Sequence, residues 1–211
     1  MPRRAARPKK PAPAYHHGDL RRALLDAAFK ILKTEGPAAL SLREVARRAG
    51  VSHQAPYHHF ASRAHLLAAL SCDGFEQLAE SLERVQAATA DPVRRMQNTG
   101  VEYIMFASRS PGRFRLMFGA ELGARDPYPD LSAAAQRVFG LLVRPFGMPS
   151  QPARGSAGQD VVLTLWSTVH GLAALAVDGQ VKLEGKALEA AARATTERLW
   201  FGVQAALSPR A

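Results

Sequence analysis

The sequence has one cysteine and no long apolar segment, and each shortage excludes a kind of protein. Cys72 alone cannot form an internal disulfide or supply a metal site built from several thiolates. No apolar run approaches the ~20 residues of a membrane-spanning helix, and no apolar stretch follows the basic N-terminus. We therefore expect no membrane segment and no secretion signal, and predict a cytoplasmic protein.

Acidic residues are scarce in the first third of the chain, and this scarcity locates the positive charge. The chain holds 28 Lys and Arg against 18 Asp and Glu, a net charge of +10. Residues 1–65 hold 13 of these bases and 4 of the acids, a balance of +9, which leaves 15 and 14, a balance of +1, for residues 66–211. Because basic residues that neutralise phosphates release condensed counterions, charge concentrated in this way is typical of a protein that binds a polyanion such as double-stranded DNA.

The first segment of the chain predicts an arm followed by a helix. Residues 1–13 contain five basic residues, four prolines and no acidic residue, so we expect a basic disordered arm. Apolar residues follow helical spacing from Leu20 onward, and Gly36 with Pro37 ends the pattern. A first helix of about four turns is therefore predicted.

The stretch SLREVARRAGVS predicts a helix, a tight turn and a second helix. Ser41 and Glu44 have the spacing of a capping box, in which the hydroxyl accepts from the amide of Glu44 and the carboxylate bonds back to the amide of Ser41. Apolar residues form one stripe of this helix and leave Arg43 outside. Gly50 suits the left-handed conformation that ends a helix, and Ser52 can cap the next one.

That next helix is HQAPYHHF, and its three histidines raise the question of a metal site. No two of them have the i, i+4 spacing that places two imidazoles on one helical face, and the segment holds no carboxylate or cysteine, whereas a closed zinc site needs four ligands. The exposed face would instead present His53, Gln54, Tyr57 and His58, whose hydrogen-bonding groups suit base edges and phosphate oxygens. We predict DNA contacts and no metal.

The stretch LSLREVARRAGVSHQAPYHHFASRAHLLAAL resembles the N-terminal signature of the TetR/AcrR family of bacterial transcriptional regulators. The shared pattern is Ala-Gly-Val-Ser, then Tyr-x-x-Phe, a basic residue three further on and paired leucines, and the preceding YHHGDLRRALLDAA is similar to the first helix of one branch. The likeness covers residues 16–70, with Pro56 in place of the more usual aliphatic or small residue. It implies an all-α fold of about nine helices, with an N-terminal three-helix helix-turn-helix domain and a C-terminal helical ligand-binding and dimerisation domain.

The resemblance also implies domain limits and a DNA-binding site. We place the DNA-binding domain at residues 14–64 and the ligand-binding and dimerisation domain at residues 65–211. By position in the motif, His53 and Gln54 would face bases. The candidates for phosphate contacts would be Ser41, Tyr57, His58, His59 and Arg63. The predicted DNA-binding residues are Ser41, Arg43, Ser52, His53, Gln54, Tyr57, His58, His59 and Arg63.

The remaining two-thirds of the chain predict helices separated by Gly/Pro-rich loops. We expect a long helix from Arg63 and a short one from Pro111. The other expected helices are 92–106, 131–146, 159–177 and 186–207.

Two sets of side chains are candidates for a ligand cavity. Trp166 and His170 are four residues apart and share a helical face, and with Gly171 they are similar to the Trp-His-Gly motif of one TetR subgroup. Alternatively, His170 is a core histidine and Trp166 only fills space. The second set is Met105, Phe106, Phe114, Met117 and Phe118, which fits a cavity wall or a core.

Small residues in the same helix suggest a dimer interface. We assign Gly171, Ala174 and Val177 to it, because small side chains let a partner helix approach, and two helices from each of two chains would form a four-helix interface. A two-fold homodimer is also what a palindromic operator requires.

The resemblance, taken with these features, implies a repressor that acts in the cytoplasm, on the nucleoid, and releases DNA when a largely apolar small molecule binds. We expect no cofactor and no catalysis, because no nucleophile, carboxylate pair or glycine-rich phosphate loop accompanies the histidines. The alternative is an architectural DNA-binding protein without small-molecule sensing, which explains the charge but gives the large C-terminal part no task.

Overall fold

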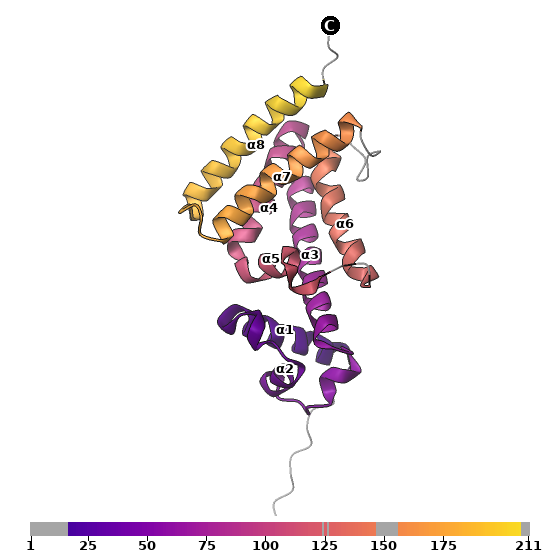
Figure 1. The fold of residues 1–211 in the computed structure, drawn as a ribbon. Coiled ribbons are helices and arrows are strands. Elements are labelled where there is room, and N and C mark those ends of the chain that lie inside the picture. The colour runs from indigo at the N-terminus through magenta and orange to yellow at the C-terminus, as the bar shows by residue number, and fades with distance from the viewer. Residues whose placement is uncertain (1–16, 124, 126, 147–155, 208–211) are drawn as a thin grey trace, which may run out of the picture.

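The computed structural model describes residues 17–123, 125, 127–146 and 156–207, and these residues form helices and no strands (Figure 1). The predicted all-α fold is therefore confirmed. The α-helices are α1 (His17–Glu35), α2 (Leu42–Ala49), α3 (Arg63–Ala87), α4 (Pro92–Arg109), α5 (Pro111–Phe118), α6 (Pro129–Val143), α7 (Ala157–Val177) and α8 (Gly185–Leu207). Four short 3₁₀ helices lie in the segments between them, namely η1 (Pro37–Ala39), η2 (Ala55–His58), η3 (Ala120–Leu122) and η4 (Arg144–Phe146). The predicted arm, residues 1–13, lies outside the described residues.

The described residues form a small head and a larger body (Figure 1). The head consists of α1, η1, α2, η2 and the first turns of α3, and its core joins residues such as Leu24, Ile31, Val45 and Phe60. The body consists of the rest of α3 and helices α4 to α8, with a separate apolar core that includes Tyr103. Helix α3 contributes to both cores and is the connection between the two parts.

Helix α2 begins and ends where the sequence predicted. The hydroxyl of Ser41 accepts a hydrogen bond from the amide of Glu44 at 3.2 Å, and Gly50 ends the helix with φ of 69°. The predicted return bond of the capping box is wrong. The carboxylate of Glu44 instead accepts hydrogen bonds from Arg47 Nε and Arg48 Nε, each at 2.8 Å, because these longer side chains lie on the same helical face.

The segment after the turn is a 3₁₀ helix, so the predicted second helix is wrong in type. Its bonds run from the amide of Ala55 to the carbonyl of Ser52 at 3.0 Å and from the amide of Tyr57 to the carbonyl of Gln54 at 3.1 Å, a spacing of three residues. Pro56 explains the difference, because it has no amide hydrogen with which to close the first α-helical turn. One of the nine expected helices is thus η2, and eight α-helices are described.

The body is arranged around α3 (Figure 1). Helices α4, α5 and α6 pack against α3, and α7 and α8 pack against α4 and against each other. Apart from η2, the predicted helices agree with the observed ones to within about three residues at each end, which is the usual uncertainty of helix limits.

Helix α7 corrects the expectation that no apolar stretch approaches the length of a membrane-spanning helix. Residues Gly158–Val177 form a helix long and apolar enough to cross a membrane by length and composition. One such helix is weak evidence, since a helix in the core of a water-soluble bundle passes the same test, and α7 packs against α4, α6 and α8. Only about a quarter of its apolar window, 28%, is buried within the chain, which leaves an outer face.

Candidate DNA-binding surface and ligand cavity

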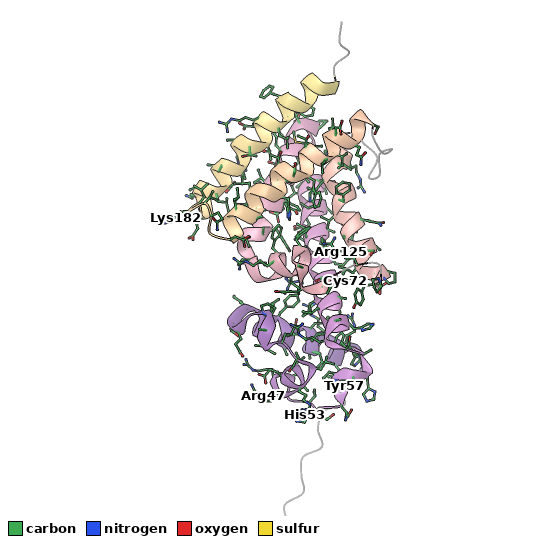
Figure 2. All side chains as sticks on the ribbon, viewed as in Figure 1. Arg47, His53, Tyr57, Cys72, Arg125 and Lys182 are labelled. Carbon is green, nitrogen blue, oxygen red and sulfur yellow. The ribbon has the colours of Figure 1, made fainter. Side chains whose placement is uncertain are left out.

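The end of the head distant from the body carries an exposed polar surface. His53, Gln54, Tyr57 and His58 are all exposed, and Figure 2 shows His53 and Tyr57 projecting from this end. Tyr57 is 48% exposed although it is a large aromatic residue. The structure thus brings together the four residues that the sequence placed on an exposed face.

Buried side chains hold this surface in place. Pro56 is buried beneath the exposed residues, and Phe60, which follows them, is 2% exposed within the core of the head. His59 is half-buried and lies against the ring of Phe60, with ring centroids 6.3 Å apart. Of the three histidines, His53 and His58 therefore face outward and His59 faces the head.

The remaining predicted DNA-binding residues differ in how free their polar groups are. Arg63 is exposed, but its guanidinium donates to the carbonyls of Leu40 at 2.9 Å and Pro37 at 2.7 Å, so it also ties the start of α3 to η1. Ser41 is exposed while its hydroxyl caps α2. Arg43 and Ser52 are exposed, and neither side chain has a hydrogen bond or ion pair with the described residues.

The basic residues at the end of α2 are already partly neutralised. Hydrogen bonds from Arg47 lower the pKa of Glu44 to about 2, and Arg48 contributes in the same direction. Arg48 also contacts Glu35 of α1. Arg43, on the same helix, is therefore a freer cation for a phosphate than either of these two arginines.

The described part of the chain does not assemble a metal site. Within it, no group of three or more His, Cys, Asp and Glu side chains lies close enough to hold an ion. His53 and His58 belong instead to the exposed polar surface of the head.

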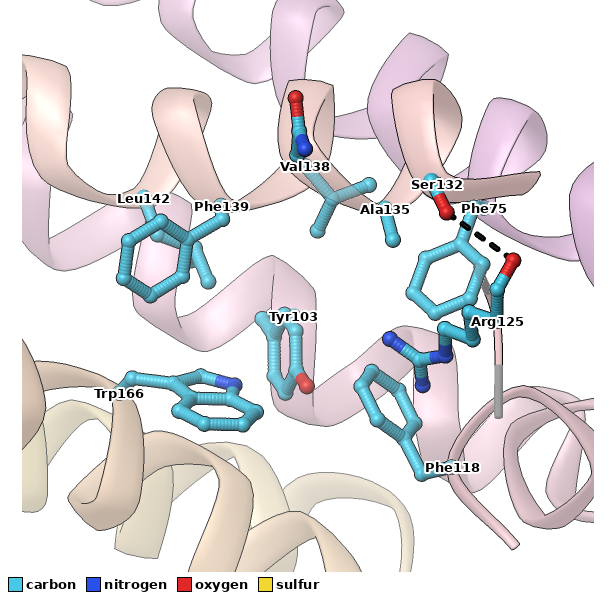
Figure 3. A pocket seen from close by; sticks show the side chains of 11 residues that line it. Phe75, Tyr103, Phe118, Arg125, Ser132, Ala135, Val138, Phe139, Leu142 and Trp166 are labelled. Carbon is cyan, nitrogen blue, oxygen red and sulfur yellow. Dashed lines mark hydrogen bonds between the residues drawn. The ribbon is translucent and has the colours of Figure 1, made fainter. Parts of the chain in front are cut away.

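A cavity of about 410 Å³ lies in the body, lined by residues of α3, α4, α5, α6 and α7 (Figure 3). Aromatic rings form much of its wall, and the guanidinium of Arg125 lies at one end. The lining residues are Phe75, Tyr103, Phe118, Arg125, Ser132, Ala135, Gln136, Val138, Phe139, Leu142 and Trp166. A mostly apolar cavity of this size with a few polar groups is typical of small-molecule sites.

His170 lies behind this wall and is hydrogen-bonded. Its Nδ1 is 2.9 Å from the hydroxyl of Tyr103, and its ring centroid is 4.5 Å from that of Phe118. Burial lowers the pKa of His170 below its ordinary value of 6.5 and raises the pKa of Tyr103, so both groups are neutral at pH 7. Of the predicted pair, Trp166 lines the cavity and His170 supports Tyr103.

The second predicted set is divided between cavity and core. Phe118 lines the cavity, whereas Phe106, Phe114 and Met117 are buried in the core of the body. Met105 is half-buried and lines a different surface hollow, together with polar residues of α4 and α8.

Several cavity residues escaped the sequence patterns. Phe75 and Phe139 are not among the predicted ligand-binding residues, and Tyr103 lies beside the predicted Met105 and Phe106 but faces the cavity. Arg125 lies in a Gly/Pro-rich loop, where no periodicity exists. Its signal was a basic residue in an interrupted stretch between two apolar helices.

The predicted dimer residues lie partly on the outer face of α7. Gly171 and Ala174 are half-exposed, and a Cβ added at Gly171 would meet nothing in the described chain within 4 Å. Val177 is buried in its own body core. Leu163 and Leu175 of α7 are 57% and 46% exposed, and Phe201 of α8 is 70% exposed. These apolar residues leave an outer face on α7 and α8.

Fold and site together define a class of protein: a DNA-binding regulator whose small head is joined by one long helix to a helical body with a cavity. Comparison with known proteins gives the family. Residues 24–70 match the family described as "Bacterial regulatory proteins, tetR family", and residues 96–199 match the "Tetracyclin repressor-like, C-terminal domain". The HTH-type transcriptional regulator Rv1816 of Mycobacterium tuberculosis is 31% identical over 193 residues, covering 76% of this chain and 78% of that protein. The chain belongs to the TetR family, as its residues predicted.

Other relatives and solved structures agree with this assignment. A protein of unknown function from Rhodococcus sp. RHA1 has a TM-score of 0.74 and 32% identity, over 90% of this chain and 98% of that one. FadR from Bacillus subtilis, solved in complex with stearoyl-CoA, has a TM-score of 0.65 and 15% identity over 85% of this chain and 97% of that one, which shows the same fold. The nucleoid occlusion factor SlmA of Aliivibrio fischeri is 30% identical over 118 residues, 56% of this chain and 57% of that protein. The Trp-His-Gly subgroup stays a prediction.

Proposed function

We propose that this transcriptional regulator is a repressor that binds a palindromic operator as a homodimer and releases it when a small molecule enters the body cavity. One observation carries the proposal. The cavity is lined by Phe75, which lies on α3, the same helix that begins in the head at Arg63. A ligand against Phe75 therefore acts on the helix that joins the cavity to the DNA-contacting head.

The proposed DNA contacts come from the exposed surface of the head. Gln54 and His53 would meet base edges, because amide and imidazole groups donate and accept hydrogen bonds in the major groove. The hydroxyl of Tyr57 and the guanidinium of Arg43 would meet phosphates, which fix the position of the head without reading sequence. The regulator would make these contacts on the nucleoid, in the cytoplasm.

Release would follow from a change in the position of α3. Leu66, Leu67 and Leu70 of α3 lie in the core of the head, whereas Phe75 and Leu78 of the same helix lie in the core of the body. A ligand that favours one position of Phe75 favours one position of the head, provided that it binds the two states with different affinity.

The homodimer would use the outer face of α7 and α8. Leu163, Leu175 and Phe201 are exposed there, and Gly171 with Ala174 lets a second helix approach. These exposed apolar side chains lie on two adjacent helices, and a second copy of the chain is a suitable cover for them. The two-fold symmetry would place two heads on two half-sites.

The test is selection of binding sites from random duplex DNA by the full-length protein, followed by affinity measurement with and without cavity ligands. We expect two half-sites related by two-fold symmetry, and weaker binding when ligand is present. Binding that prefers no sequence, and does not respond to any cavity ligand, would instead support the alternative of a DNA-binding protein without small-molecule sensing. The cavity in the body supports a sensor over that alternative.

A further inference from the structure

The cavity contains one cation among aromatic rings. The Cζ atom of Arg125 is 5.1 Å from the ring centroid of Phe75 and 5.8 Å from that of Phe118, and Figure 3 shows the guanidinium between these two rings. Cations stack favourably on aromatic faces, and the arrangement keeps the guanidinium directed along the cavity. The cavity therefore has an apolar region and one positively charged end.

Arg125 has no carboxylate partner among the described residues. Its Nη2 donates to the carbonyl of Met117 at 2.7 Å, which leaves further N–H groups of the guanidinium available. Other arginines of the body are paired: Arg113 binds Asp73 at 2.6 Å, and Arg137 binds Glu83 at 2.8 Å. Burial lowers the pKa of Arg125, which means that its charge is less well solvated than it would be in water.

The backbone of Arg125 is held in place on α6. Its carbonyl accepts hydrogen bonds from the amide of Tyr128 at 2.8 Å and from the hydroxyl of Ser132 at 3.2 Å. With the backbone fixed by these two bonds and the guanidinium fixed by two rings and one carbonyl, little side-chain freedom remains to be lost on binding. Such preorganised donors favour a specific partner.

We propose that the cavity selects a small amphipathic carboxylic acid, whose carboxylate binds the guanidinium of Arg125 and whose aromatic or aliphatic body lies against the wall that Phe139 and Trp166 form. This inference rests on the proposed function, because it names the class of ligand that the same cavity takes. A guanidinium and a carboxylate match in charge and in planar geometry. The other polar lining groups, such as Ser132 and Gln136, are neutral, so the site offers one positive charge for one negative charge.

The same geometry predicts which ligands are rejected. An amide of equal shape would leave the charge of Arg125 uncompensated, and an amine would place a second cation beside it. A volume of about 410 Å³ also limits the ligand to a small molecule. The preference should therefore follow the charge of the head group and not the shape of the body.

The experiment measures binding of matched ligands to the full-length protein by calorimetry. The probes are 4-phenylbutanoate, 2-naphthoate and decanoate, each with its neutral amide and its amine of the same carbon skeleton. We expect at least one acid to bind about tenfold or more tightly than its amide, and its amine to bind more weakly still. Arg125→Gln should remove the difference between acid and amide, whereas Arg125→Lys should keep a preference for the acid at reduced affinity.

Matched controls separate this inference from a fold defect and from the proposed function. Arg137→Gln removes an arginine from the outer face of α6, where it pairs with Glu76 and Glu83, and should leave acid binding unchanged. Amides that bind as tightly as acids, an acid preference that persists in Arg125→Gln, or no binding by any acid would overturn the inference. Operator binding is measured in parallel, so loss of the proposed regulator function would be seen as absent sequence-specific DNA binding even if acids bind.

Discussion

The carboxylate of Asp73 accepts a hydrogen bond from Arg113 at 2.6 Å, and this pair joins α3 to α5. The other carboxylate oxygen accepts from Arg22 of α1 at 3.2 Å, so a single acid contacts both head and body. The guanidinium of Arg113 also lies over the ring of Phe29 in α1, with Cζ 3.7 Å from the ring centroid. One carboxylate of the connecting helix thus joins polar groups of head and body, beside the apolar contact that Leu116 of α5 makes with the core of the head.

Asp73→Asn should destabilise the protein by about 1–3 kcal/mol, because the amide leaves the half-buried charge of Arg113 without compensation. Urea unfolding of the full-length protein at fixed concentration measures the change. The control is Glu189→Gln, which removes the partner of the exposed Arg193 and should cost less than about 0.5 kcal/mol. Equal losses in both variants would show that Asp73 is an ordinary surface acid.

Gly100→Ala should cost about 1–3 kcal/mol, because its new Cβ would lie 2.7 Å from Thr196 Cγ2 and 3.3 Å from Val169 Cγ1, which are branched side chains that cannot move aside. Gly74→Ala is the matched variant. There the nearest atoms, at 2.8 and 2.9 Å, belong to the flexible side chain of Met117, so we expect a loss below about 1 kcal/mol. Thermal unfolding compares the two, and a larger loss for Gly74→Ala would contradict the packing argument.

Ala174→Arg and Gly171→Leu should shift the protein from dimer to monomer and weaken operator binding. The introduced side chains would occupy the outer face of α7, where a Cβ at Gly171 now meets nothing within 4 Å. Sedimentation velocity measures the oligomeric state. Ala133→Arg, on an exposed position of α6, is the control and should stay dimeric. Unchanged sedimentation of both α7 variants would remove this face as the interface.

Stability should fall as the pH is lowered below about 6.5, in part because of His170. Burial lowers the pKa of this histidine in the folded state, so between its folded and unfolded pKa values the unfolded chain binds the additional proton. The stabilisation is therefore full above the unfolded value and is lost on acidification. His170→Gln, which can still bond to Tyr103, should flatten the pH dependence, and a slope equal to that of the unaltered protein would contradict this argument. Denaturant midpoints at several pH values provide the comparison.

Gln54→Ala should relax discrimination at particular base pairs by about 1–3 kcal/mol, the value of a good bidentate contact. Tyr57→Phe should weaken binding to all sequences alike, because a phosphate contact carries no base information. A scan of operator variants by fluorescence anisotropy separates the two patterns. Metal analysis of untagged protein is the control for the histidines: one tightly held zinc per chain, lost in His53→Ala and His58→Ala, would mean that this surface is a metal site.

Local signals in the sequence predicted the helices, because caps and apolar spacing act within a few residues. Helix α2 begins after Ser41 and ends at Gly50, as expected. At the start of α4, the carboxylate of Asp91 accepts a hydrogen bond from the amide of Arg94 at 2.7 Å. The sequence predicted an α-helix where η2 is a 3₁₀ helix. The difference depends on the single amide hydrogen that Pro56 lacks. Features that depend on distant segments were also missed.

The cavity illustrates that limit. Its wall combines residues from five helices and a loop, and no spacing in the sequence reports that Phe75, Tyr103 and Arg125 meet. Phe118 and Trp166 were predicted because aromatic residues at helical spacing are visible along one element. Met105 and Phe106 satisfy the same pattern, and only the rotation of α4 decides that Tyr103, rather than these two, faces the cavity.

Because α3 belongs to both cores, this protein has no loop at which its head can be exchanged for that of a relative. A chimaera must be joined inside the helix, after Leu70 of the head core and before Phe75 of the cavity. One residue inserted there would rotate the two halves of α3 by about 100° relative to each other, since an α-helix has 3.6 residues per turn. Phe75 would then leave the cavity while the head stayed folded. A working sensor with a new operator therefore depends on preserving the helical register between Leu70 and Phe75.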